Sequence, residues 1–458
     1  MASSPARIFA ALNAERPPER ATPVMGRAIV IGGSVAGLLA ARVLAGHAES
    51  VVVIDRDDPR TAGARPGVPQ GTQLHALLPG GFLLLERLFP GFREHALAQG
   101  AVEAPPAGRR SYLDGRLKVV VPDDADSLAG TRPFLEGLIR QQVLRMPNVE
   151  TRTARATGLV FDGAVTAGVR YDDGGAPGVE RGDLVVDAMG RSSRLSDWLE
   201  RAGGERPATR RMRVDLNYAT ALFRRRETDP RPTLVMALHS PAASSDVAGA
   251  AFFAVEDGRW MAMMAGYGDS RPGRTADDFV RRLRSQFPPE FGELAGNEML
   301  GDVRTYHHAD SRRREFHALR RLPARLVSVG DAVASFNPVY GQGITAAALH
   351  AACLSRYVRA KPDPDAPARE FFALQKVVVD AAWSTSTSAD LALPHVDGPY
   401  PRGHRLRSWV SRQIVTATIT DVAVARRFNR VVSLSAHPNS LVTPGVLLGA
   451  LRANRRAR

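Results

Sequence analysis

The sequence predicts an α/β protein with three parts: a domain built on a parallel sheet, an α+β domain with an antiparallel sheet, and a helical C-terminal region. Three observations lead to this prediction. An apolar segment, a glycine turn and a helical pattern follow one another within residues 28–46. Strand-like segments fill much of residues 205–310. Helical patterns dominate after residue 361.

These patterns place the domain boundaries. We expect an N-terminal arm at residues 1–25, because this segment carries Pro17, Pro18 and Glu19 and has no long apolar stretch. The first domain is expected over residues 26–204 and 311–360, the second over 205–310, and the helical region over 361–458. At 458 residues the chain is long enough for two or three domains around a large core.

The first domain opens with one βαβ unit. Residues 28–31 are apolar and predict a buried strand, a glycine turn follows, and a helical pattern then runs to Gly46. Residues 51–54 predict a second buried strand, which ends in Asp55. Two strands joined by a helix in this way predict a parallel sheet.

The later elements follow from composition and period. Residues 59–72 are rich in Pro, Gly and Arg and predict a loop. Alternation over 149–171 around Asp162-Gly163 predicts a hairpin, and the apolar runs 184–186 and 326–329 predict buried strands. Further strands are expected at 214–223, 232–239, 250–255 and 260–267, and helices at 76–98, 132–146, 275–286 and 343–358. A Pro-rich break at 394–401 divides the C-terminal helices.

The glycine turn is a variant of the dinucleotide-binding (Rossmann-type) fingerprint. It reads Gly32-Gly33-Ser34-Val35-Ala36-Gly37, and Asp55 follows eighteen residues after Gly37. The first glycine permits a tight turn, the small third residue lets the backbone approach a pyrophosphate, and the last glycine lets the helix pack closely. The helix N-terminus favours the phosphate charge, and Asp55 can hold ribose hydroxyls. The alternative is a glycine turn that binds nothing.

Two later segments resemble motifs of flavoprotein monooxygenases. Residues 183–193, which include Asp187-Ala188-Met189-Gly190, resemble the middle motif, and residues 326–332 with 337–343 resemble the third. The third motif implies that Asp331 contacts the ribitol hydroxyls and that backbone N–H groups near Gly341 and Gly343 approach the flavin ring. The positive end of the following helix would point at the ring. A Gly-Asp turn that merely caps a helix is the alternative for Asp331.

The chain as a whole resembles the FAD-dependent monooxygenases of the aromatic-hydroxylase type, which have the fold of p-hydroxybenzoate hydroxylase. It looks closest to bacterial natural-product epoxidases and hydroxylases, including the polyether epoxidases. Residues 67–70 with His75, residues 88–91, residues 132–136 and the tail around Trp383 and Asp390 add to this likeness. The likeness covers nearly the whole chain from about residue 27.

Fingerprint and resemblance together imply a set of FAD contacts. These are Gly32, Gly33, Ser34, Val35, Ala36, Gly37, Asp55, Arg56, Arg132, Asp331, Pro338, Gly341, Gln342, Gly343 and Ile344. Arg140 is a second arginine that the resemblance places near the cofactor, although both arginines also suit an exposed surface. His75 is the one candidate catalytic side chain, with a histidine satisfied by its surroundings as the alternative.

The resemblance implies a monooxygenase of secondary metabolism (antibiotic biosynthesis) that uses O₂ and a flavin C4a-hydroperoxide to oxygenate a hydrophobic natural-product intermediate. Epoxidation of an alkene is favoured over hydroxylation of a phenol, because no residue stands out as the base that a phenol needs. Aromatic hydroxylation, a flavin dehydrogenase or reductase without oxygen insertion, and a scaffold that holds FAD structurally are the alternatives. A membrane-associated quinone hydroxylase needs an anchor, and Asp421 interrupts the one candidate, residues 405–427.

The middle motif departs from the family at Met189, where an aspartate is usual. The resemblance associates that aspartate with cofactor and NAD(P)H contacts, and the sequence has no second glycine fingerprint. We therefore expect NAD(P)H to bind transiently, or a separate flavin reductase to supply the electrons.

Composition argues against several other classes. The net charge of +14 and pI of about 10.7 come from scattered arginines without a nucleic-acid-binding motif, so we expect a solvated basic surface and no nucleic-acid partner. The single cysteine, Cys353, lies in an apolar run and predicts a core residue. No metal-binding spacing and no apolar run of about eighteen residues occurs, so no metal site and no membrane span are expected. The natural class is a cytoplasmic enzyme.

Overall fold

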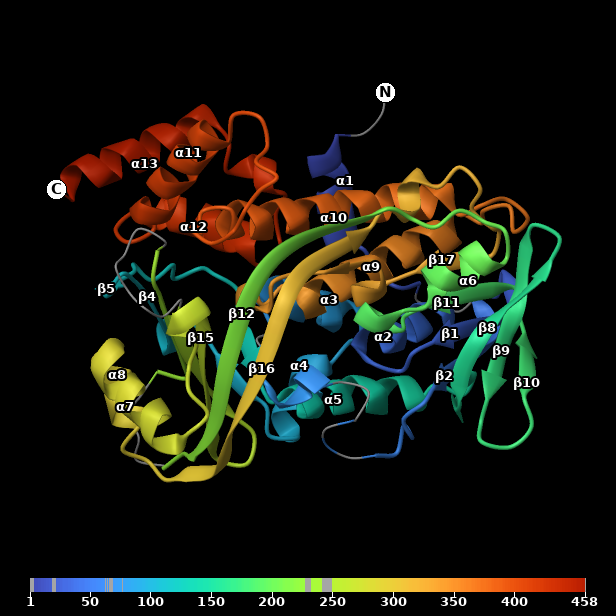
Figure 1. The fold of residues 1–458 in the computed structure, drawn as a ribbon, viewed down its shortest axis with the longest axis horizontal. Coiled ribbons are helices and arrows are strands. Elements are labelled where there is room, and N and C mark those ends of the chain that lie inside the picture. Colours follow the sequence, from blue (N-terminus) through green and yellow to red (C-terminus); the bar gives the residue numbers. More distant parts are fainter. Residues whose placement is uncertain are drawn as a thin grey trace.

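The structure is a computed structural model, and it describes residues 4–18, 22–61, 63, 65, 69–75, 77–226, 232–240 and 249–457. Figure 1 shows its layout: the parallel sheet lies on the right, two long strands cross the centre, and the C-terminal helices gather at the upper left. The predicted α/β fold, with parallel sheet, antiparallel sheet and helical C-terminal region, is confirmed.

The parallel sheet has the strand order β17-β11-β1-β2-β7. Its central strands are apolar and buried over their whole inner length, as expected for a sheet covered on both faces. Helix α2 packs against both α5 and α9. The bounds are β1 Met25–Ile31, β2 Ala48–Asp55, β7 Val149–Thr153, β11 Leu184–Asp187, β17 Leu326–Ser328, α2 Val35–Leu44, α5 Arg132–Leu144 and α9 Gly343–Arg359.

A larger, mainly antiparallel sheet has the order β18-β16-β12-β15-β14-β13-β4-β5. The long strands β12 and β16 pair along most of their length and connect the two halves of the molecule (Figure 1). The bounds are β4 Arg109–Leu113, β5 Arg116–Leu117, β12 Thr209–Arg224, β13 Leu234–Leu238, β14 Gly249–Val255, β15 Arg259–Tyr267, β16 Met299–Arg314 and β18 Ala334–Ser335.

Three strands of this sheet come from outside the expected range 205–310. Strand β4 adds to the edge by pairing in parallel with β13, and β18 pairs with the end of β16. Strand β4 also pairs with the two-residue strand β5, which is the edge of the sheet. Residues 109–113 have no alternating apolar pattern, and none of their side chains is fully buried. The sheet therefore includes strands that come before and after residues 205–310. The exact domain boundaries remain predictions.

The two faces of this sheet have different neighbours, since alternate residues of a strand point to opposite faces. Phe252 and Trp260 pack with α8, where the rings of Phe252 and Phe291 are 5.0 Å apart. These two aromatics belong to the core under α7 and α8. Tyr218, Met263 and Tyr267 lie on the other face, together with residues that follow α10. The helices are α7 Ala276–Gln286, α8 Pro289–Leu294 and α10 Arg369–Asp390.

The expectation of a loose N-terminal arm is wrong for its first part. Helix α1, Pro5–Asn13, begins at an N-cap, Ser4, and packs against α9 and α10. Phe9 and Leu12 lie three residues apart, hence on one helix face, and both are 0% exposed. These two side chains dock the segment onto the core.

The C-terminal region contains α10, α11 His404–Ala417, α12 Val422–Val432 and α13 Pro444–Arg456, as the helical patterns predicted. Asp421 does not interrupt an apolar face. Its carboxylate accepts a hydrogen bond of 2.9 Å from the Val424 N–H and caps α12, so residues 405–427 are two separate helices. Within the described residues, no helix combines the length and the apolar composition needed to cross a membrane.

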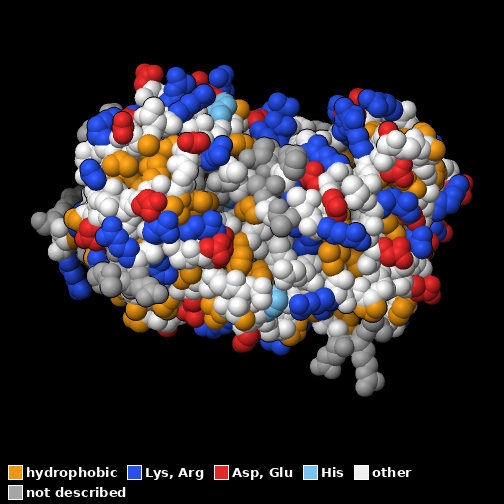
Figure 2. All heavy atoms as spheres, turned by 90° about the horizontal axis from the view of Figure 1, so that it is seen from below, with side chains coloured by type: hydrophobic (Ala, Val, Ile, Leu, Met, Phe, Trp, Pro, Cys, Tyr) orange, Lys and Arg blue, Asp and Glu red, His pale blue; other side chains and the backbone are white. Residues whose placement is uncertain are grey.

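The helical pattern at 76–98 forms two helices, α3 Pro79–Leu88 and α4 Phe92–Ala98, because Gly91 between them has a left-handed backbone with φ of +81°. Part of the predicted loop at 59–72 lies outside the described residues. Strands β8 and β9 form the predicted hairpin around Asp162-Gly163, while β7 joins the parallel sheet instead. The bounds are α3 Pro79–Leu88, α4 Phe92–Ala98, α6 Leu195–Arg201, β3 Val102–Ala104, β6 Ser127–Ala129, β8 Arg155–Asp162, β9 Val165–Asp172 and β10 Gly178–Arg181. Figure 2 shows the lower face, where Lys and Arg side chains are spread over the whole width with Asp and Glu between them.

Candidate active site

The glycine turn between β1 and α2 has the close contacts that its sequence predicted. Gly32 has φ of +109° and donates its N–H to the Ile54 carbonyl at 2.8 Å. A Cβ on Gly37 would lie 1.7 Å from the Gly32 carbonyl oxygen, and one on Gly32 would lie 2.4 Å from the Ala188 oxygen. Both positions therefore require glycine, and the turn lies directly against the middle motif.

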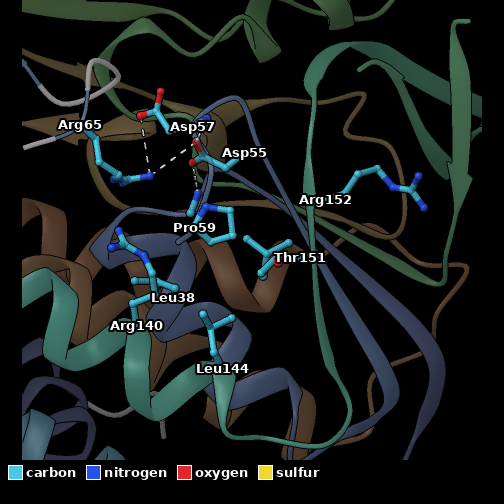
Figure 3. Close-up of a pocket in the computed structure, with 11 residues that line it drawn as sticks. Leu38, Asp55, Asp57, Pro59, Arg65, Arg140, Leu144, Thr151 and Arg152 are labelled. Carbon is cyan, nitrogen blue, oxygen red and sulfur yellow. Dashed lines mark hydrogen bonds and ion pairs between the residues drawn. The ribbon is translucent and has the colours of Figure 1, made fainter. Parts of the chain in front are cut away.

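Asp55 ends β2 beside this turn. Its carboxylate accepts hydrogen bonds from the N–H groups of Gly33 and Asp57, the latter at 2.8 Å. Asp55 lines a small pocket together with Leu38, Arg65 and Arg140 (Figure 3). The adjacent Arg56 is exposed to solvent. Backbone N–H groups therefore hold the predicted acid beside the turn.

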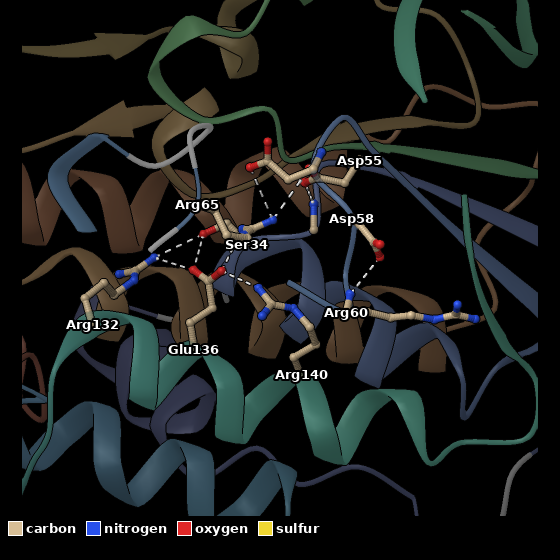
Figure 4. A network of polar contacts seen from close by, with 10 residues as sticks. Ser34, Asp55, Asp58, Arg60, Arg65, Arg132, Glu136 and Arg140 are labelled. Carbon is tan, nitrogen blue, oxygen red and sulfur yellow. Dashed lines mark hydrogen bonds and ion pairs between the residues drawn. The ribbon is translucent and has the colours of Figure 1, made fainter. Parts of the chain in front are cut away.

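A buried carboxylate, Glu136 of α5, gathers the charged groups near the N-terminus of α2 (Figure 4). It accepts from the Ser34 hydroxyl at 2.7 Å and pairs with Arg65 at 2.6 Å, Arg140 at 2.5 Å and Arg132 at 3.3 Å. Burial acts to raise the pKa of Glu136, and the Arg132 and Arg65 guanidiniums outweigh it, so the pKa is lowered. Glu136 is thus an ionised anchor for three arginines.

This cluster includes two residues that the sequence did not single out, Arg65 and Glu136. Arg65 lies in the loop predicted from Pro, Gly and Arg content, and a loop arginine carries no periodic signal. The Nε atoms of Arg65 and Arg132 are buried and have no hydrogen-bond partner among the described residues. Buried donors of this kind suit an anionic ligand.

The third motif meets the fingerprint at Gly330. A Cβ there would lie 2.5 Å from the Cβ of Ala36, so the turn Gly330–Ala332 packs on the start of α2. Burial raises the pKa of Asp331, and the positive charges of Arg132, Arg191 and Arg314 oppose that shift. Arg132 therefore acts electrostatically on both Asp331 and Glu136, and it donates a hydrogen bond of 3.1 Å to the Ser34 hydroxyl of the first motif.

The loop before α9 also has the predicted shape. Gly341 has φ of +65°, and no heavy atom of another described residue lies within 4 Å of the place that a Cβ on Gly343 would take. Gln342 is buried and accepts from the Ser386 hydroxyl at 3.0 Å, while its Nε2 has no partner in the part of the chain that the structure describes. Ile344 is buried, and Pro338 is exposed. The N-terminus of a 17-residue helix therefore opens onto free space.

The middle motif has a structural role of its own. Asp187 is buried and accepts from the Ser193 hydroxyl at 2.7 Å and the Ser328 hydroxyl at 3.0 Å. The carboxylate thereby links β11 to β17. Met189, at the unusual position of the motif, donates its N–H to Asp187 at 3.0 Å and packs against the main core.

His75 lies near the arginine cluster and is satisfied by the backbone. Its Nδ1 is 2.8 Å from the Gln73 carbonyl oxygen, and burial together with the charge of Arg132 lowers the pKa of His75 to about 4. The imidazole is therefore neutral at physiological pH. Gly67 and Val68, which belong to the same predicted stretch, lie outside the described residues.

An apolar wall lies between the large sheet and the end of α10. Its buried members are Met212, Val214, Leu216, Tyr218, Met263, Ala265, Leu391 and Val396. Polar groups stand within it: Asp390 accepts from the Asn337 amide at 2.8 Å and from the Tyr340 hydroxyl at 2.9 Å. Tyr267 lies beside them, with its hydroxyl 3.4 Å from the Asn337 amide nitrogen. This wall therefore adjoins the loop that leads to Gly341.

Comparisons with known proteins agree with this geometry. The chain matches no protein-family model. It is 32% identical to Protein Rv3254 of Mycobacterium tuberculosis (strain ATCC 25618 / H37Rv) over 428 residues, which cover 89% of each chain.

Solved structures with a similar fold include the flavin-dependent brominase Bmp2, with a TM-score of 0.64 and 16% identity over 94% of this chain and 99% of that one. The p-nitrophenol 4-monooxygenase PnpA of Pseudomonas putida DLL-E4 has a TM-score of 0.63 and 18% identity over 90% and 99%. PqsL of Pseudomonas aeruginosa, described as a probable FAD-dependent monooxygenase, has a TM-score of 0.59 and 17% identity over 80% and 97%. The chain therefore belongs to the family of Protein Rv3254 and has the fold of the flavin-dependent monooxygenases.

Proposed function

We propose that this chain is an FAD-dependent monooxygenase that inserts one oxygen atom from O₂ into a hydrophobic organic molecule. The observation that carries the proposal is the meeting of three sequence-distant motifs around the N-terminus of α2. Gly37 packs against Ala188 of the middle motif, Ala36 packs against Gly330 of the third motif, and Arg132 donates a hydrogen bond of 3.1 Å to the Ser34 hydroxyl of the first motif.

The residues present fit FAD. The turn at Gly32–Gly37 and the unpartnered Nε of Arg132 suit the pyrophosphate, and Asp55 suits a ribose. Asp331 suits the ribitol chain. The open space in front of Gly343 suits the flavin ring, with the positive end of α9 pointing at it. When bound, FAD supplies the redox chemistry that activates O₂.

The protein's own contribution is to bind, orient and exclude water. Glu136 fixes the direction of Arg65, Arg132 and Arg140, so these cations need no rearrangement to meet an anionic cofactor. The apolar wall with Met263 and Leu391 keeps water away from the reacting groups. A hydrophobic substrate fits this wall better than a charged one.

The kind of oxygenation is the finer part of the proposal. The resemblance to natural-product enzymes supports epoxidation of an electron-rich alkene, which needs little acid–base assistance. Hydroxylation of a phenol is the second candidate, and one observation favours it: Asp390 places a buried carboxyl in the apolar wall, where a phenol's base is needed.

The source of electrons is proposed to be either transiently bound NAD(P)H or a separate flavin reductase. Met189 in place of an acidic residue supports this view, because its side chain packs into the core and offers no charge for a nicotinamide.

The test combines oxygen consumption and isotope labelling. FAD-loaded protein is supplied with reducing equivalents, ¹⁸O₂ and a panel of hydrophobic alkenes and phenols. Incorporation of one labelled oxygen atom into product supports the proposal. A flavin dehydrogenase or reductase on the same fold would convert substrate without labelling it, and a protein that remains colourless after FAD is added would refute FAD binding itself.

A further inference from the structure

The last three helices form a small unit at one end of the molecule, with a core of its own. Helices α11 and α13 pack side by side, and the Asn454 amide donates to the Gln413 carbonyl at 3.0 Å. Helix α12 contacts the rest of the chain through Asn429, which donates to Asp124 at 2.9 Å (Figure 1). The shared core contains Ile414, Ala417, Val424, Val446, Ala450 and Ala453. The faces of α11 and α13 that point away from this core are largely exposed.

Four large apolar side chains are exposed on or beside these two helices. Leu406 and Trp409 are 66% and 39% exposed, and they lie three residues apart, hence on one side of α11. Leu448 is 53% exposed and lies on the side of α13 opposite to the core, and Val442, just before α13, is 74% exposed. Exposed apolar side chains that gather in one small unit mark an interaction surface. We call these four residues, together with the arginines of α11 and α13, the C-terminal surface.

Positive charge is concentrated in the same unit. Residues 402–458 contain eleven arginines, no lysine and one acidic residue, Asp421, and so carry ten of the fourteen net positive charges of the chain. The Asp421 carboxylate is occupied as the N-cap of α12. Among the described arginines of this unit, Arg426 alone lies within 4.0 Å of a carboxylate, that of Asp123 at 2.6 Å. The C-terminal surface is therefore strongly basic, and its arginines are available to an external anion.

Arginines and apolar side chains alternate on the same helix faces. Arg405 and Arg412 lie four residues before and three residues after Trp409, so they flank it on α11. Arg452 lies four residues after Leu448 and is its neighbour on the outer face of α13. Helices that lie in the interface of a bilayer have this arrangement, because arginine side chains reach the phosphates while their apolar neighbours enter the hydrocarbon.

The chemistry of the surface distinguishes between the candidate partners. A second copy of the chain would bring the same ten positive charges to the contact, and these repel one another. Nucleic acid supplies phosphates, but it offers no apolar layer beside them for Leu406, Trp409 and Leu448. A bilayer with anionic lipids supplies both, because its phosphate layer lies directly over the hydrocarbon. Tryptophan is also enriched at that interface.

We propose that the C-terminal surface binds a lipid bilayer that contains anionic lipids. Leu406, Trp409 and Leu448 enter the outer part of the hydrocarbon layer, and the arginines around them contact lipid phosphates. The contact is interfacial and needs no spanning helix. None of the residues assigned to FAD lies in this unit, so the proposal goes beyond the oxygenation chemistry and does not depend on it.

The test is co-sedimentation of the FAD-loaded full chain with lipid vesicles. One set of vesicles contains equal parts of phosphatidylglycerol and phosphatidylcholine, and the other contains phosphatidylcholine alone. We expect binding to the anionic vesicles to be about a hundredfold tighter or more, because several arginines act together. This binding should be lost in about 1 M salt, where the Debye length is about 3 Å.

Two double variants separate the charge from the insertion. Leu406→Ser with Trp409→Ser should weaken binding to anionic vesicles by about tenfold or more, because two apolar side chains no longer enter the hydrocarbon. Arg405→Gln with Arg412→Gln should weaken it by about thirtyfold. All four side chains are exposed, so we expect the fold to be retained, and circular dichroism checks this.

The matched controls lie at the other end of the molecule (Figure 1). Val179→Ser, on β10, replaces an apolar side chain that is 51% exposed. Arg155→Gln with Arg181→Gln, on β8 and β10, replaces two exposed arginines. Both controls should bind anionic vesicles as tightly as the wild-type protein does.

Tryptophan emission reports where the contact forms. Trp198 and Trp260 are buried and Trp383 is half-buried, so Trp409 is the tryptophan most exposed to solvent. Anionic vesicles should shift the emission of the wild-type protein to shorter wavelength, because Trp409 leaves water. In Trp409→Phe the shift should disappear while binding persists.

Equal binding of the wild-type protein to anionic and neutral vesicles, or binding to neither, overturns the proposal. Undiminished binding in Leu406→Ser with Trp409→Ser, or an unshifted wild-type emission, overturns the insertion of these side chains. Duplex DNA and polyglutamate are tested in parallel. Retention of either at a salt concentration that releases anionic vesicles assigns the surface to nucleic acid or to an acidic protein instead. A colourless protein that binds anionic vesicles defeats the proposed function and leaves this proposal standing.

Discussion

The contact at Gly37 yields a quantitative prediction. Gly37→Ala places a methyl carbon 1.7 Å from the Gly32 carbonyl oxygen, so the strand turn and α2 must separate by about 1.3 Å to restore a contact of 3.0 Å. The oxygen is a backbone atom and the backbone fixes the position of the methyl carbon, so neither atom can rotate away. Overpacking of this kind costs about 1–3 kcal/mol of folding free energy. The same movement withdraws the turn's N–H groups from a bound pyrophosphate.

The assay has two parts. Chemical denaturation of the apoprotein measures the loss of stability, and titration of FAD followed by its fluorescence measures affinity, which we expect to fall by about tenfold or more. Gly137→Ala is the matched control: it lies inside α5, its Cβ would meet nothing within 4 Å, and alanine should stabilise that helix by about 0.5–1 kcal/mol. If Gly37→Ala has the same stability and the same FAD affinity as the wild-type protein, the packing argument is refuted.

Four further predictions concern the site. Glu136→Gln leaves three arginines without their shared counter-charge and should lower the unfolding free energy by about 3 kcal/mol or more in denaturant titrations; no loss would mean that the cluster is not electrostatically coupled. Asp331→Ala should release FAD during gel filtration while circular dichroism stays unchanged, and full retention would contradict its assigned contact. Burial raises the pKa of Asp390 from 3.8 to about 6, so ionisation of this carboxyl destabilises the folded state relative to the unfolded state. The protonated carboxyl contributes its full stability below pH 4, and this contribution is lost as pH rises through 6. The unfolding free energy of Asp390→Asn should therefore rise by about 2–3 kcal/mol relative to that of the wild type between pH 4 and 8. If the unfolding free energies of the two proteins change with pH in the same way, the pKa of Asp390 is not raised. Finally, an added flavin reductase should greatly accelerate turnover, whereas fast flavin reduction by NADPH alone, saturating at micromolar concentration, would contradict the role inferred from Met189.

Much of the molecule could be predicted from local sequence. The turn Gly32–Gly37, the strand ending in Asp55 and the helix that begins at Gly343 were expected where the structure has them. The hairpin at Asp162-Gly163 and the C-terminal helices were expected too. Each is specified by nearby residues, through the period of apolar side chains and the backbone freedom of glycine. The order of such elements along the chain was enough to predict the α/β fold.

Other features depend on residues far apart in the chain. Phe9 and Leu12 bury α1 against helices that begin more than 300 residues later, and strand β4 exists because β13 offers it an edge. Glu136 pairs with arginines from a loop and from its own helix. Asp390 Oδ2 has no hydrogen-bond partner among the described residues, and this follows only from how the end of α10 packs against the loop at Asn337. No local sequence pattern encodes these contacts between distant segments. Burial and hydrogen-bond satisfaction are properties of the packed chain, because they depend on which distant surfaces exclude water from a side chain.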